Sequence, residues 1–473
     1  MADTSKSKHQ AAGNGGEISP VLSDDHASVE KGSTKEDNFE VFRDDGDVAF
    51  RTVGWIWATA IFLKIIFATG VLTIPTAMAA LGSFPGAVNV LGWQAVNTYS
   101  GVLMGDFRNR HAGVHSVADM AQIVGGKILR EIIGFLFIIT WVIVAASGIV
   151  GASTALNALS EHALCTNYFT LIVALVMAGL AGIRKFEHIG WLTWAGFVTI
   201  YAAVLIVVIG VTQRDRPAAA PQSGPYELGY TVFGSPDFVA GINAATSIFC
   251  SGSGTSAFMP VISEMRNPKD YKKSLFVCMG IVTASYLTFS LVVYYYCGVW
   301  VASPSLGSAG GTIKKVAYGV GLLGLLVTAS LYTHVAAKYL FVRILRNSKH
   351  LQSNTVVHWG TWLGCTLSLS AVAFVIAGGV PIFNYLLSLA GSVGFASITI
   401  TLPAYCYVYD HKSFRTGTMM QQIKYWFHWF LISLGTFLTV AGTYGVVQAV
   451  IDAYANGAVG RAFDCADNSG TVV

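Results

Sequence analysis

Two stretches of small residues interrupt long apolar segments of the sequence and could bind a small charged molecule through their peptide groups. They consist of Ala68, Thr69, Gly70 and Val71 in the first segment, and of Cys250, Ser251, Gly252, Ser253 and Gly254 in the second. Where a helix is interrupted, the free N–H groups of a half-helix suit a carboxylate, and free carbonyl and hydroxyl oxygens suit an ammonium group. Together these groups predict a site for an amino acid.

Both interruptions fall at the same depth in their segments. Gly70 lies seventeen positions after Val53, and Gly252 lies sixteen positions after Pro236. Gly and Ser are also common in membrane helices because they allow close packing, and for a single Gly-rich segment that explanation is preferred. Two interruptions in register favour a binding site, because an inverted repeat brings two broken helices face to face at the midplane.

The composition places these segments in a lipid bilayer. Of 473 residues, 53% are hydrophobic and only 11% are charged, and the mean hydropathy is +0.57. Soluble domains contain about 25% charged residues. The formal net charge of +4 does not indicate a nucleic acid partner, because the basic residues are sorted by loop rather than gathered into one patch. The sequence therefore excludes a soluble protein.

Eleven apolar segments follow Arg51, each close to the roughly 20 residues that a helix needs to cross a bilayer. They run at about 53–79, 84–106, 132–158, 168–183, 189–211, 236–263, 275–300, 316–345, 355–377, 382–408 and 425–451. We expect an all-α polytopic membrane protein with about 11 transmembrane helices. Spans one to five and six to ten would form a 5+5 inverted repeat in which helices 1 and 6 are broken.

The domain organisation follows from these segments. Residues 1–50 are polar, lack a signal peptide and are predicted to be a disordered cytoplasmic tail. The transporter domain would cover 51–451, with repeat one at about 53–211, repeat two at about 236–408 and an extra helix at about 425–451. Residues 452–473 would form an extracytoplasmic C-terminal tail.

The distribution of Lys and Arg predicts the orientation. Sixteen of them lie in loops on the side of the N-terminal tail and five on the other side, and short cytoplasmic loops retain such an excess. The N-terminus would be cytoplasmic and the C-terminus outside. Cys165 and Cys465 then share the outer face, where a disulfide or two unpaired thiols are the alternatives. The segment 116–135 has helical apolar spacing beside basic residues, which favours a helix along the inner surface over an extended loop.

A few ionisable and hydroxyl residues within the spans are candidates for coupling to a cation. Lys64 lies eleven positions into the first span, where it could exchange a proton or replace a sodium ion with a fixed charge, or else extend to the inner surface. His334 and Lys338 share one face of the eighth span, with Ser330 and Thr333 one turn earlier. For His334 a packing role is the alternative.

Several longer strings resemble the amino acid/auxin permease family, and in particular fungal neutral amino acid permeases of the amino acid-polyamine-organocation superfamily. They are FLKIIFATGVLTIPTAMAALG, SVADMAQIVGGKILREI, SEMRNPKDYKKSL and SLYTHVAAKYLFVRIL. The resemblance implies eleven spans, a sodium/leucine-transporter-like core, and amino acid uptake coupled to protons or sodium.

The resemblance also implies roles for individual residues. The first interruption, Ala68 to Val71, would contact the substrate carboxylate. Phe249, with Ser251 to Gly254, would face the amino group and side chain. Hydroxyl oxygens of the eighth span beside the first usually hold a sodium ion in this architecture, so Lys338 would repel sodium if it pointed there.

These observations predict a symporter of neutral aliphatic or aromatic amino acids, since neither broken helix carries a carboxylate at mid-membrane that would select a cationic side chain. Proton coupling is preferred and sodium coupling is the alternative. A membrane-embedded enzyme or a passive channel are the rivals from other classes; no catalytic motif, metal site, cofactor or obligate partner subunit is indicated. The plasma membrane is the expected location, with the vacuolar membrane as alternative. Glu264 and Arg266 are candidates for an inner gate.

Overall fold

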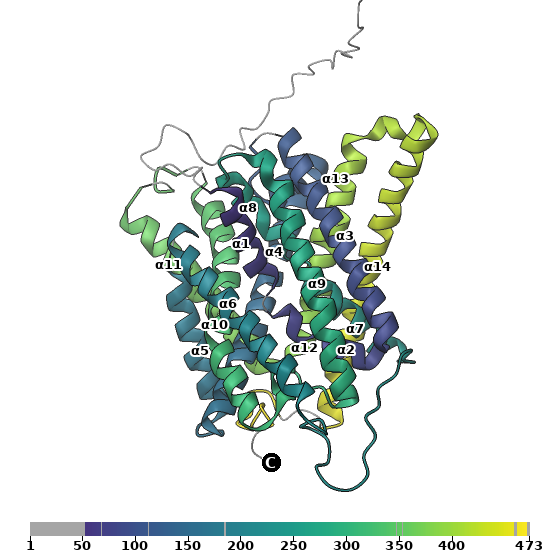
Figure 1. Cartoon of the computed structure of the whole chain (residues 1–473). Coiled ribbons are helices and arrows are strands. Elements are labelled where there is room, and N and C mark those ends of the chain that lie inside the picture. Colours follow the sequence, from purple (N-terminus) through teal and green to yellow (C-terminus); the bar gives the residue numbers. More distant parts are fainter. Residues whose placement is uncertain are drawn as a thin grey trace, which may run out of the picture. The chain divides into compact units, whose positions relative to one another are not determined.

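The computed structural model describes residues 53–67, 69–111, 113–183, 186–346, 348–351, 353–457 and 461–470, with only the backbone of 186–190. Helices in these residues correspond to each of the eleven apolar segments of the sequence (Figure 1). Eight helical segments are long and apolar enough to cross a membrane, and a shorter apolar helix covers Thr166–Ala181. The prediction of an all-α polytopic membrane protein is confirmed.

The first five spans have the following bounds. The first span consists of α1 (Trp55–Ile66), the 3-10 turn η1 (Gly70–Leu72) and α2 (Ile74–Leu81). The next four are α3 (Ser83–Arg110), α4 (Val117–Ser160), α5 (Thr166–Ala181) and α6 (Phe186–Thr212).

The sixth span is also divided, into α7 (Phe238–Ser251), the 3-10 turn η2 (Gly254–Ala257) and α8 (Phe258–Glu264). It is followed by α9 (Tyr271–Cys297), α10 (Gly311–Leu345) and α11 (Val356–Gly379). The tenth span joins α12 (Phe383–Ala390) to α13 (Leu402–Asp410) through a π-helical stretch, Gly391–Thr401, and α14 (Met419–Ala455) is the last. Short 3-10 turns cover Pro268–Asp270, Gly298–Trp300, Ser305–Ala309 and Lys412–Thr416.

The start of α4 refines the expectation for segment 116–135. Residues from Val117 onward are helical, but Gly126 has φ 72° and ψ −166°, so the helix is kinked before it enters the span. A positive φ of this kind is accessible to Gly at little cost. Ser116 caps the helix in a capping box with Asp119.

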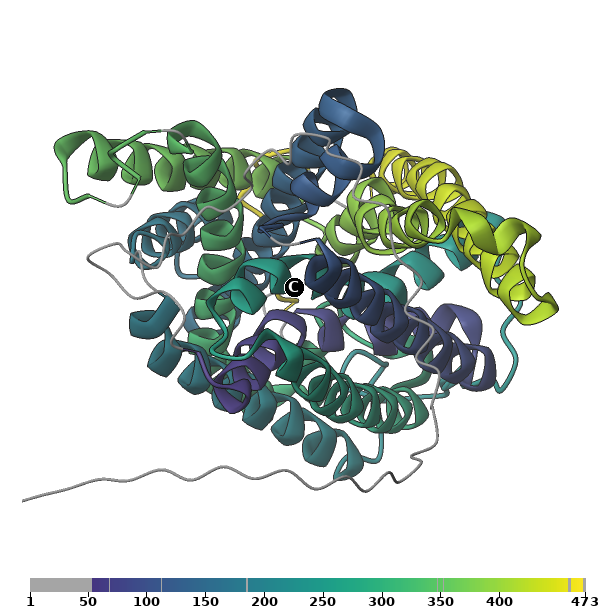
Figure 2. The ribbon, with the colours of Figure 1, turned by 90° about the horizontal axis from the view of Figure 1, so that it is seen from above.

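The two predicted repeats interlock rather than lie side by side. Helix α10 packs against α4, α5, α6 and α11, while α9 packs against α1, α2 and α3, and α7 against α2, α12 and α14. Viewed from above, the purple first span lies among the other helices (Figure 2). Its residues from Ala58 to Ile66 are all buried. The first broken helix is therefore enclosed by protein.

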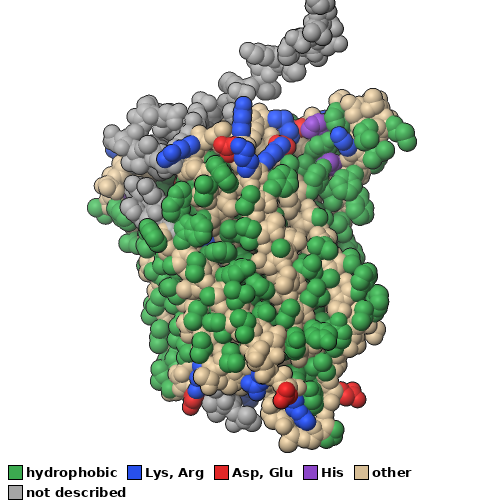
Figure 3. All heavy atoms as spheres, viewed as in Figure 1, with side chains coloured by type: hydrophobic (Ala, Val, Ile, Leu, Met, Phe, Trp, Pro, Cys, Tyr) green, Lys and Arg blue, Asp and Glu red, His purple; other side chains and the backbone are tan. Residues whose placement is uncertain are grey.

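Apolar side chains cover the sides of the helices and charged side chains gather at their two ends (Figure 3). Trp191, Val440 and Leu175 are 82%, 68% and 63% exposed, which is the arrangement expected of a surface in contact with lipid. We call the end that carries Arg110, Lys272 and Arg346 the basic end. The opposite end carries a disulfide and is called the disulfide end.

The disulfide joins Cys165, just before α5, to Cys465 near the C-terminus. Residues 461–470, which we call the C-terminal strap, are also held by hydrogen bonds. The Thr166 hydroxyl donates to the carbonyl of Ala466 (2.6 Å), and the Asn157 amide donates to the side chain of Asn468 (2.8 Å). The sequence left open whether Cys165 and Cys465 form a disulfide or remain free thiols, and the structure shows the disulfide.

Candidate functional site

The two helix interruptions meet inside the protein. Gly70 lies against Ser251 so closely that a Cβ atom at position 70 would be 2.8 Å from the Ser251 Cα atom. Gly254 is nearly as close to the first span, because a Cβ there would lie 2.9 Å from Ile65. The predicted pairing of broken helices 1 and 6 is therefore confirmed. Ala68, which we included in the first interruption, lies outside the described residues.

Two tyrosines satisfy backbone carbonyl groups that the first interruption leaves without helical partners. The Tyr286 hydroxyl on α9 lies 2.7 Å from the carbonyl oxygen of Ile66 and 3.2 Å from that of Ser251. The Tyr332 hydroxyl on α10 lies 3.2 Å from the carbonyl oxygen of Ile65 and 3.5 Å from the Thr69 hydroxyl. Interrupted backbone is tolerated at membrane depth when the protein supplies such partners.

The second interruption is supported by α3. The Asn97 amide donates to the carbonyl of Phe249 (3.3 Å), and its oxygen accepts from the Ser253 hydroxyl (3.2 Å). A Cβ atom at Gly252 would lie 2.4 Å from the Gln94 side chain. Gln94 is 1% exposed, and its amide has no hydrogen-bond partner in the described part of the chain. This interruption therefore has polar neighbours on the side away from the first span.

A small cavity of about 280 Å³ opens where the interruptions meet, and we call it the central cavity. This volume includes space open to solvent; the part that a water molecule can occupy is about 20 Å³, which is room for about one water. Its walls contain no charged side chain. They are formed by Ile65, Ile66, Thr69, Gly70, Trp141, Val144, Cys250, Ser251, Gly254, Tyr332, Leu387 and Phe395.

The predicted substrate residues divide between two faces. Thr69, Gly70, Ser251 and Gly254 line the central cavity, as predicted for residues that meet a ligand. In contrast, Phe249, Gly252 and Ser253 contact α3 through Trp93, Gln94 and Asn97. Val71 is buried in the hydrophobic core. Contact of any of these residues with a substrate stays a prediction.

Aromatic walls of the central cavity were not predicted from the sequence. Trp141 on α4 lies 5.4 Å, between ring centroids, from both Tyr332 and Phe395. Phe395 is in the π-helical stretch of the tenth span, and such stretches are frequent at functional sites. The sequence offers no signal for these residues beyond their aromatic character, because they lie in uniformly apolar spans.

Lys64 is fully buried and does not extend to the surface. Its ammonium group donates to the carbonyl oxygens of Gly196 on α6 (3.1 Å) and Gly324 on α10 (3.0 Å), and to the Thr328 hydroxyl (2.6 Å). A Cβ atom at Gly324 would lie 2.9 Å from the Gly196 oxygen, so both positions must be small to form this oxygen cluster. The side chain thus places a cationic group among three oxygens contributed by two neighbouring helices.

The other coupling candidates lie elsewhere. Ser330 donates to the Leu326 carbonyl (2.7 Å) and Thr333 to the Ala329 carbonyl (3.1 Å) within their own helix. The Nδ1 atom of His334 lies 3.3 Å from the Ala181 carbonyl oxygen, and its ring packs edge-on against Trp362. These contacts fit the packing role given as its alternative, and a role of His334 in coupling stays a prediction.

Lys338 pairs with Glu264 instead of pointing to the hydroxyl groups of its helix, so the condition under which it would repel sodium there is not met. Its ammonium group forms an ion pair with Glu264 (2.5 Å), and both side chains are largely buried. The pair links α10 to the end of α8. Glu264 thus has a cationic partner on α10 at the basic end, where Arg266 was the expected partner. Its role in an inner gate stays a prediction.

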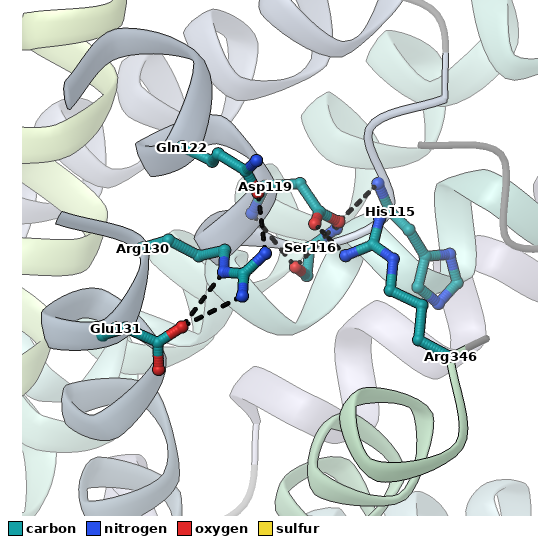
Figure 4. A network of polar contacts seen from close by, with 7 residues as sticks. All are labelled: His115, Ser116, Asp119, Gln122, Arg130, Glu131 and Arg346. Atoms are coloured by element: carbon teal, nitrogen blue, oxygen red, sulfur yellow. Dashed lines mark hydrogen bonds and ion pairs between the residues drawn. The ribbon is translucent and has the colours of Figure 1, made fainter. Parts of the chain in front are cut away.

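A polar network at the basic end also ties α10 to α4 (Figure 4). Arg346 pairs with Asp119 (2.8 Å), and Arg130 contacts Gln122 (3.0 Å) and Glu131 (3.1 Å). Burial, together with the nearby charge of Lys338, lowers the pKa of His115 well below its usual value. This network borders a cavity of about 880 Å³, open to solvent, that reaches Ser256 and Pro260 beyond the second interruption.

The sequence of the chain matches known proteins over most of its length. The family described as transmembrane amino acid transporter protein matches residues 51–448. A "transmembrane transporter" of Gibberella moniliformis is 49% identical over 94% of each chain. An "N amino acid transport system protein" of Neurospora crassa is 28% identical over 89% of this chain and 90% of its own length.

A solved structure supports the same fold. The chain resembles a Na⁺-coupled sialic acid symporter, solved in a substrate-bound outward-open state, with a TM-score of 0.50 and 12% sequence identity. The match covers 88% of this chain and 93% of the other. At this identity the likeness shows the fold alone. The likeness indicates a sodium/leucine-transporter-like core. The match over residues 51–448 shows that the chain belongs to the transmembrane amino acid transporter family.

Proposed function

We propose that this transporter is a proton-coupled symporter of neutral aliphatic or aromatic amino acids. The observation that carries the proposal is the meeting of the two helix interruptions around an uncharged central cavity. Peptide groups at the ends of half-helices suit the two charged ends of an amino acid. The fungal relative named as an N amino acid transport system protein supports this class of substrate.

The walls of the central cavity favour neutral side chains. Trp141, Phe395 and Leu387 offer apolar surface, and no Asp or Glu is present to balance a cationic side chain. An unpaired charge in such a site would be costly, since burial of a charge requires a partner. We therefore expect Leu, Phe and similar substrates to be preferred over Lys and Arg.

Lys64 supports proton coupling over sodium coupling. Its ammonium group contacts two carbonyl oxygens and one hydroxyl oxygen, which are the types of ligand that would otherwise coordinate a sodium ion. A sodium ion next to a protonated lysine would be repelled. An intramembrane lysine is also a candidate to release and rebind a proton during transport. Sodium coupling remains the second candidate, favoured by the fold shared with a Na⁺-coupled symporter.

We infer that the basic end faces the cytoplasm and that the C-terminal strap lies outside. The sorting of Lys and Arg supports this orientation, and the Cys165–Cys465 disulfide fits the non-cytosolic side, where disulfides persist. The plasma membrane is the proposed location, and a vacuolar membrane would present the strap to the lumen instead.

Uptake by purified protein in proteoliposomes tests the proposal. A panel of labelled amino acids is supplied at two external pH values, with and without sodium. We expect uptake of neutral amino acids to rise as the external pH falls and to persist without sodium. Strict sodium dependence would overturn the coupling claim. Substrate counterflow distinguishes a carrier from a channel, and a chemically altered substrate would indicate an enzyme instead.

A further inference from the structure

The central cavity and the cavity at the basic end, which we call the basic cavity, follow one another along two helices. On α4, Phe137 lines the basic cavity, and Trp141, one helical turn farther from the basic end, lines the central cavity. On α10, Tyr339 lines the basic cavity and Tyr332 lines the central one. Within the described part of the chain the two cavities share no lining residue. They are therefore separated by one to two helical turns, about 6 to 10 Å.

Aromatic rings in two layers fill the space between the two cavities. Trp141 lies 5.4 Å from Tyr332, and Phe137 lies 5.2 Å from Tyr339, between ring centroids. Phe137 and Trp141 are 6.1 Å apart and connect the layers, while Phe395 of the tenth span lies 5.4 Å from Trp141. We call these five rings the aromatic barrier. A molecule that passes along α4 and α10 from the central cavity to the basic cavity must displace at least one of them.

The rings of the central layer differ in what holds them. The Tyr332 hydroxyl is bonded to the carbonyl oxygen of Ile65 (3.2 Å), so this ring cannot move without losing a hydrogen bond. Trp141 is only 1% exposed, and its indole nitrogen has no hydrogen-bond partner among the described residues. A buried indole N–H usually has a partner, because leaving it unpaired is costly. Rotation of Trp141 therefore breaks no such bond, and contact with the water of the basic cavity would provide one.

We propose that Trp141 is the gate residue that closes the central cavity towards the basic end and rotates aside to release the substrate. Its ring contacts three of the four other rings of the aromatic barrier, so its movement alone opens both layers. The basic cavity, about 880 Å³ including space open to solvent, lies next to it and has room for the displaced ring. The inference rests on the transport function proposed above, because closure of this kind encloses a substrate during transport.

Cys250 reports the opening of the aromatic barrier independently of transport. It is a free thiol that lines the central cavity and is 6% exposed. The probe is 2-sulfonatoethyl methanethiosulfonate, a charged reagent that does not cross membranes; it forms a mixed disulfide with a thiol and releases methanesulfinate. It is applied to each side of membrane vesicles of known orientation, and modification of Cys250 is measured by mass spectrometry of peptides. Its negative charge suits the basic cavity, whose lining includes Arg130, Arg343 and Arg346.

Trp141→Ala removes the gate residue. We expect Cys250 to be modified about tenfold faster from the basic end, because the barrier opens more easily, and at an unchanged rate from the disulfide end. Trp141→Phe keeps a ring and should restore most of the protection. The matched control is Val144→Ala, which also enlarges the central cavity from α4 but lies one turn farther from the basic end; it should behave like the unmodified protein. Cys250→Ser combined with Trp141→Ala should remove the signal.

Transport by the same variants gives a second measurement. A gate that no longer closes lets substrate flow back, so Trp141→Ala in proteoliposomes should accumulate less labelled amino acid yet still exchange labelled for unlabelled substrate. Equal modification of Cys250 in Trp141→Ala and in the unmodified protein would overturn the proposal, and so would equal modification in Val144→Ala or faster modification from the disulfide end alone. If Cys250 responds as expected but no amino acid is transported, the transport function fails while the barrier stands.

Discussion

Gly70, in the first interruption, packs against main chain, whereas Gly252, in the second, packs against the end of a flexible side chain. Gly70 faces the backbone of Ser251, and Gly252 faces the amide of Gln94. The first interruption is also held at mid-span, where Lys64 and two tyrosines connect it to α6, α9 and α10. The second is held by Asn97 on α3 and shares the Tyr286 hydroxyl through the Ser251 carbonyl. Glu264 holds the second broken helix only at its basic end.

The difference suggests distinct roles for two elements that an inverted repeat would otherwise make equivalent. A contact with backbone cannot be relieved by a rotamer change, whereas a contact with a long side chain can. We therefore expect that the first interruption cannot accommodate an added side chain, whereas the second can accommodate one by movement of the neighbouring side chain. Four substitutions test this contrast.

The largest effect is expected for Gly70→Ala. The added Cβ would lie 2.8 Å from the Ser251 backbone, so the two interruptions must separate. A displacement of about 1 Å at a reacting or binding site can cost about 100-fold in rate, and we expect uptake to fall by that factor. Gly364→Ala on α11, where a Cβ meets nothing within 4 Å, is the control. Ordinary uptake by the Gly70 variant would contradict the contrast.

Replacing Lys64 by Met should have the next largest effect. The carbonyl groups of Gly196 and Gly324 would lose their shared ammonium donor but keep the hydroxyl groups of Thr199 and Thr328 as donors. Hydrogen bonds to a charged group contribute about 1.5–3 kcal/mol. We expect a lower thermal unfolding temperature and uptake that no longer responds to external pH. The variant is assayed at two pH values beside the unmodified protein. Retained pH dependence would show that the proton is carried elsewhere.

Gly252→Ala should be milder and, unlike the change at Gly70, correctable. Its Cβ would meet only the Gln94 side chain, so we expect a loss of uptake of about tenfold, near 1.4 kcal/mol. Shortening Gln94 to Ala in the same protein should restore most of the activity. The same Gln94→Ala change combined with Gly70→Ala should restore nothing. Rescue of both variants, or of neither, would remove the distinction between the interruptions.

The smallest effect is expected at the basic end of the second broken helix. Glu264→Gln removes the ion pair with Lys338, and partial solvent access limits the loss to about fivefold in uptake. Exchange of the two charges, Glu264→Lys with Lys338→Glu, should recover activity that neither single exchange retains. If the exchange fails while Glu264→Gln is active, the pair does not connect α8 to α10 during transport.

The fold was largely predictable because its signals are local. Apolar runs long enough to cross a bilayer predicted each span, and the Gly and Ser clusters around Gly70 and Gly252 predicted both interruptions. The boundaries were less accurate at α4, where the kink at Gly126 allows one helix to continue from the surface segment into the span.

The site was only partly predictable because it depends on rotation about helix axes. We chose Ser330 and Thr333, but the hydroxyl that contacts Lys64 belongs to Thr328. Two residues along a helix turn the side chain by about 200°, so a small error in the facing direction selects the wrong residue. The cavity walls combine Trp141 of α4 with Leu387 and Phe395 of the tenth span, and no local pattern brings these two distant parts of the chain together.

The Cys165–Cys465 bond makes most of this chain a covalent ring. Its ends are 300 positions apart and enclose every helix from α5 to α14. With the strap outside, as proposed above, the bond would form only after the last of these helices has crossed the membrane, and it would mark a chain whose insertion is complete. A single protease cut within residues 213–237, between α6 and α7, would open the ring yet release no fragment until a reductant is added.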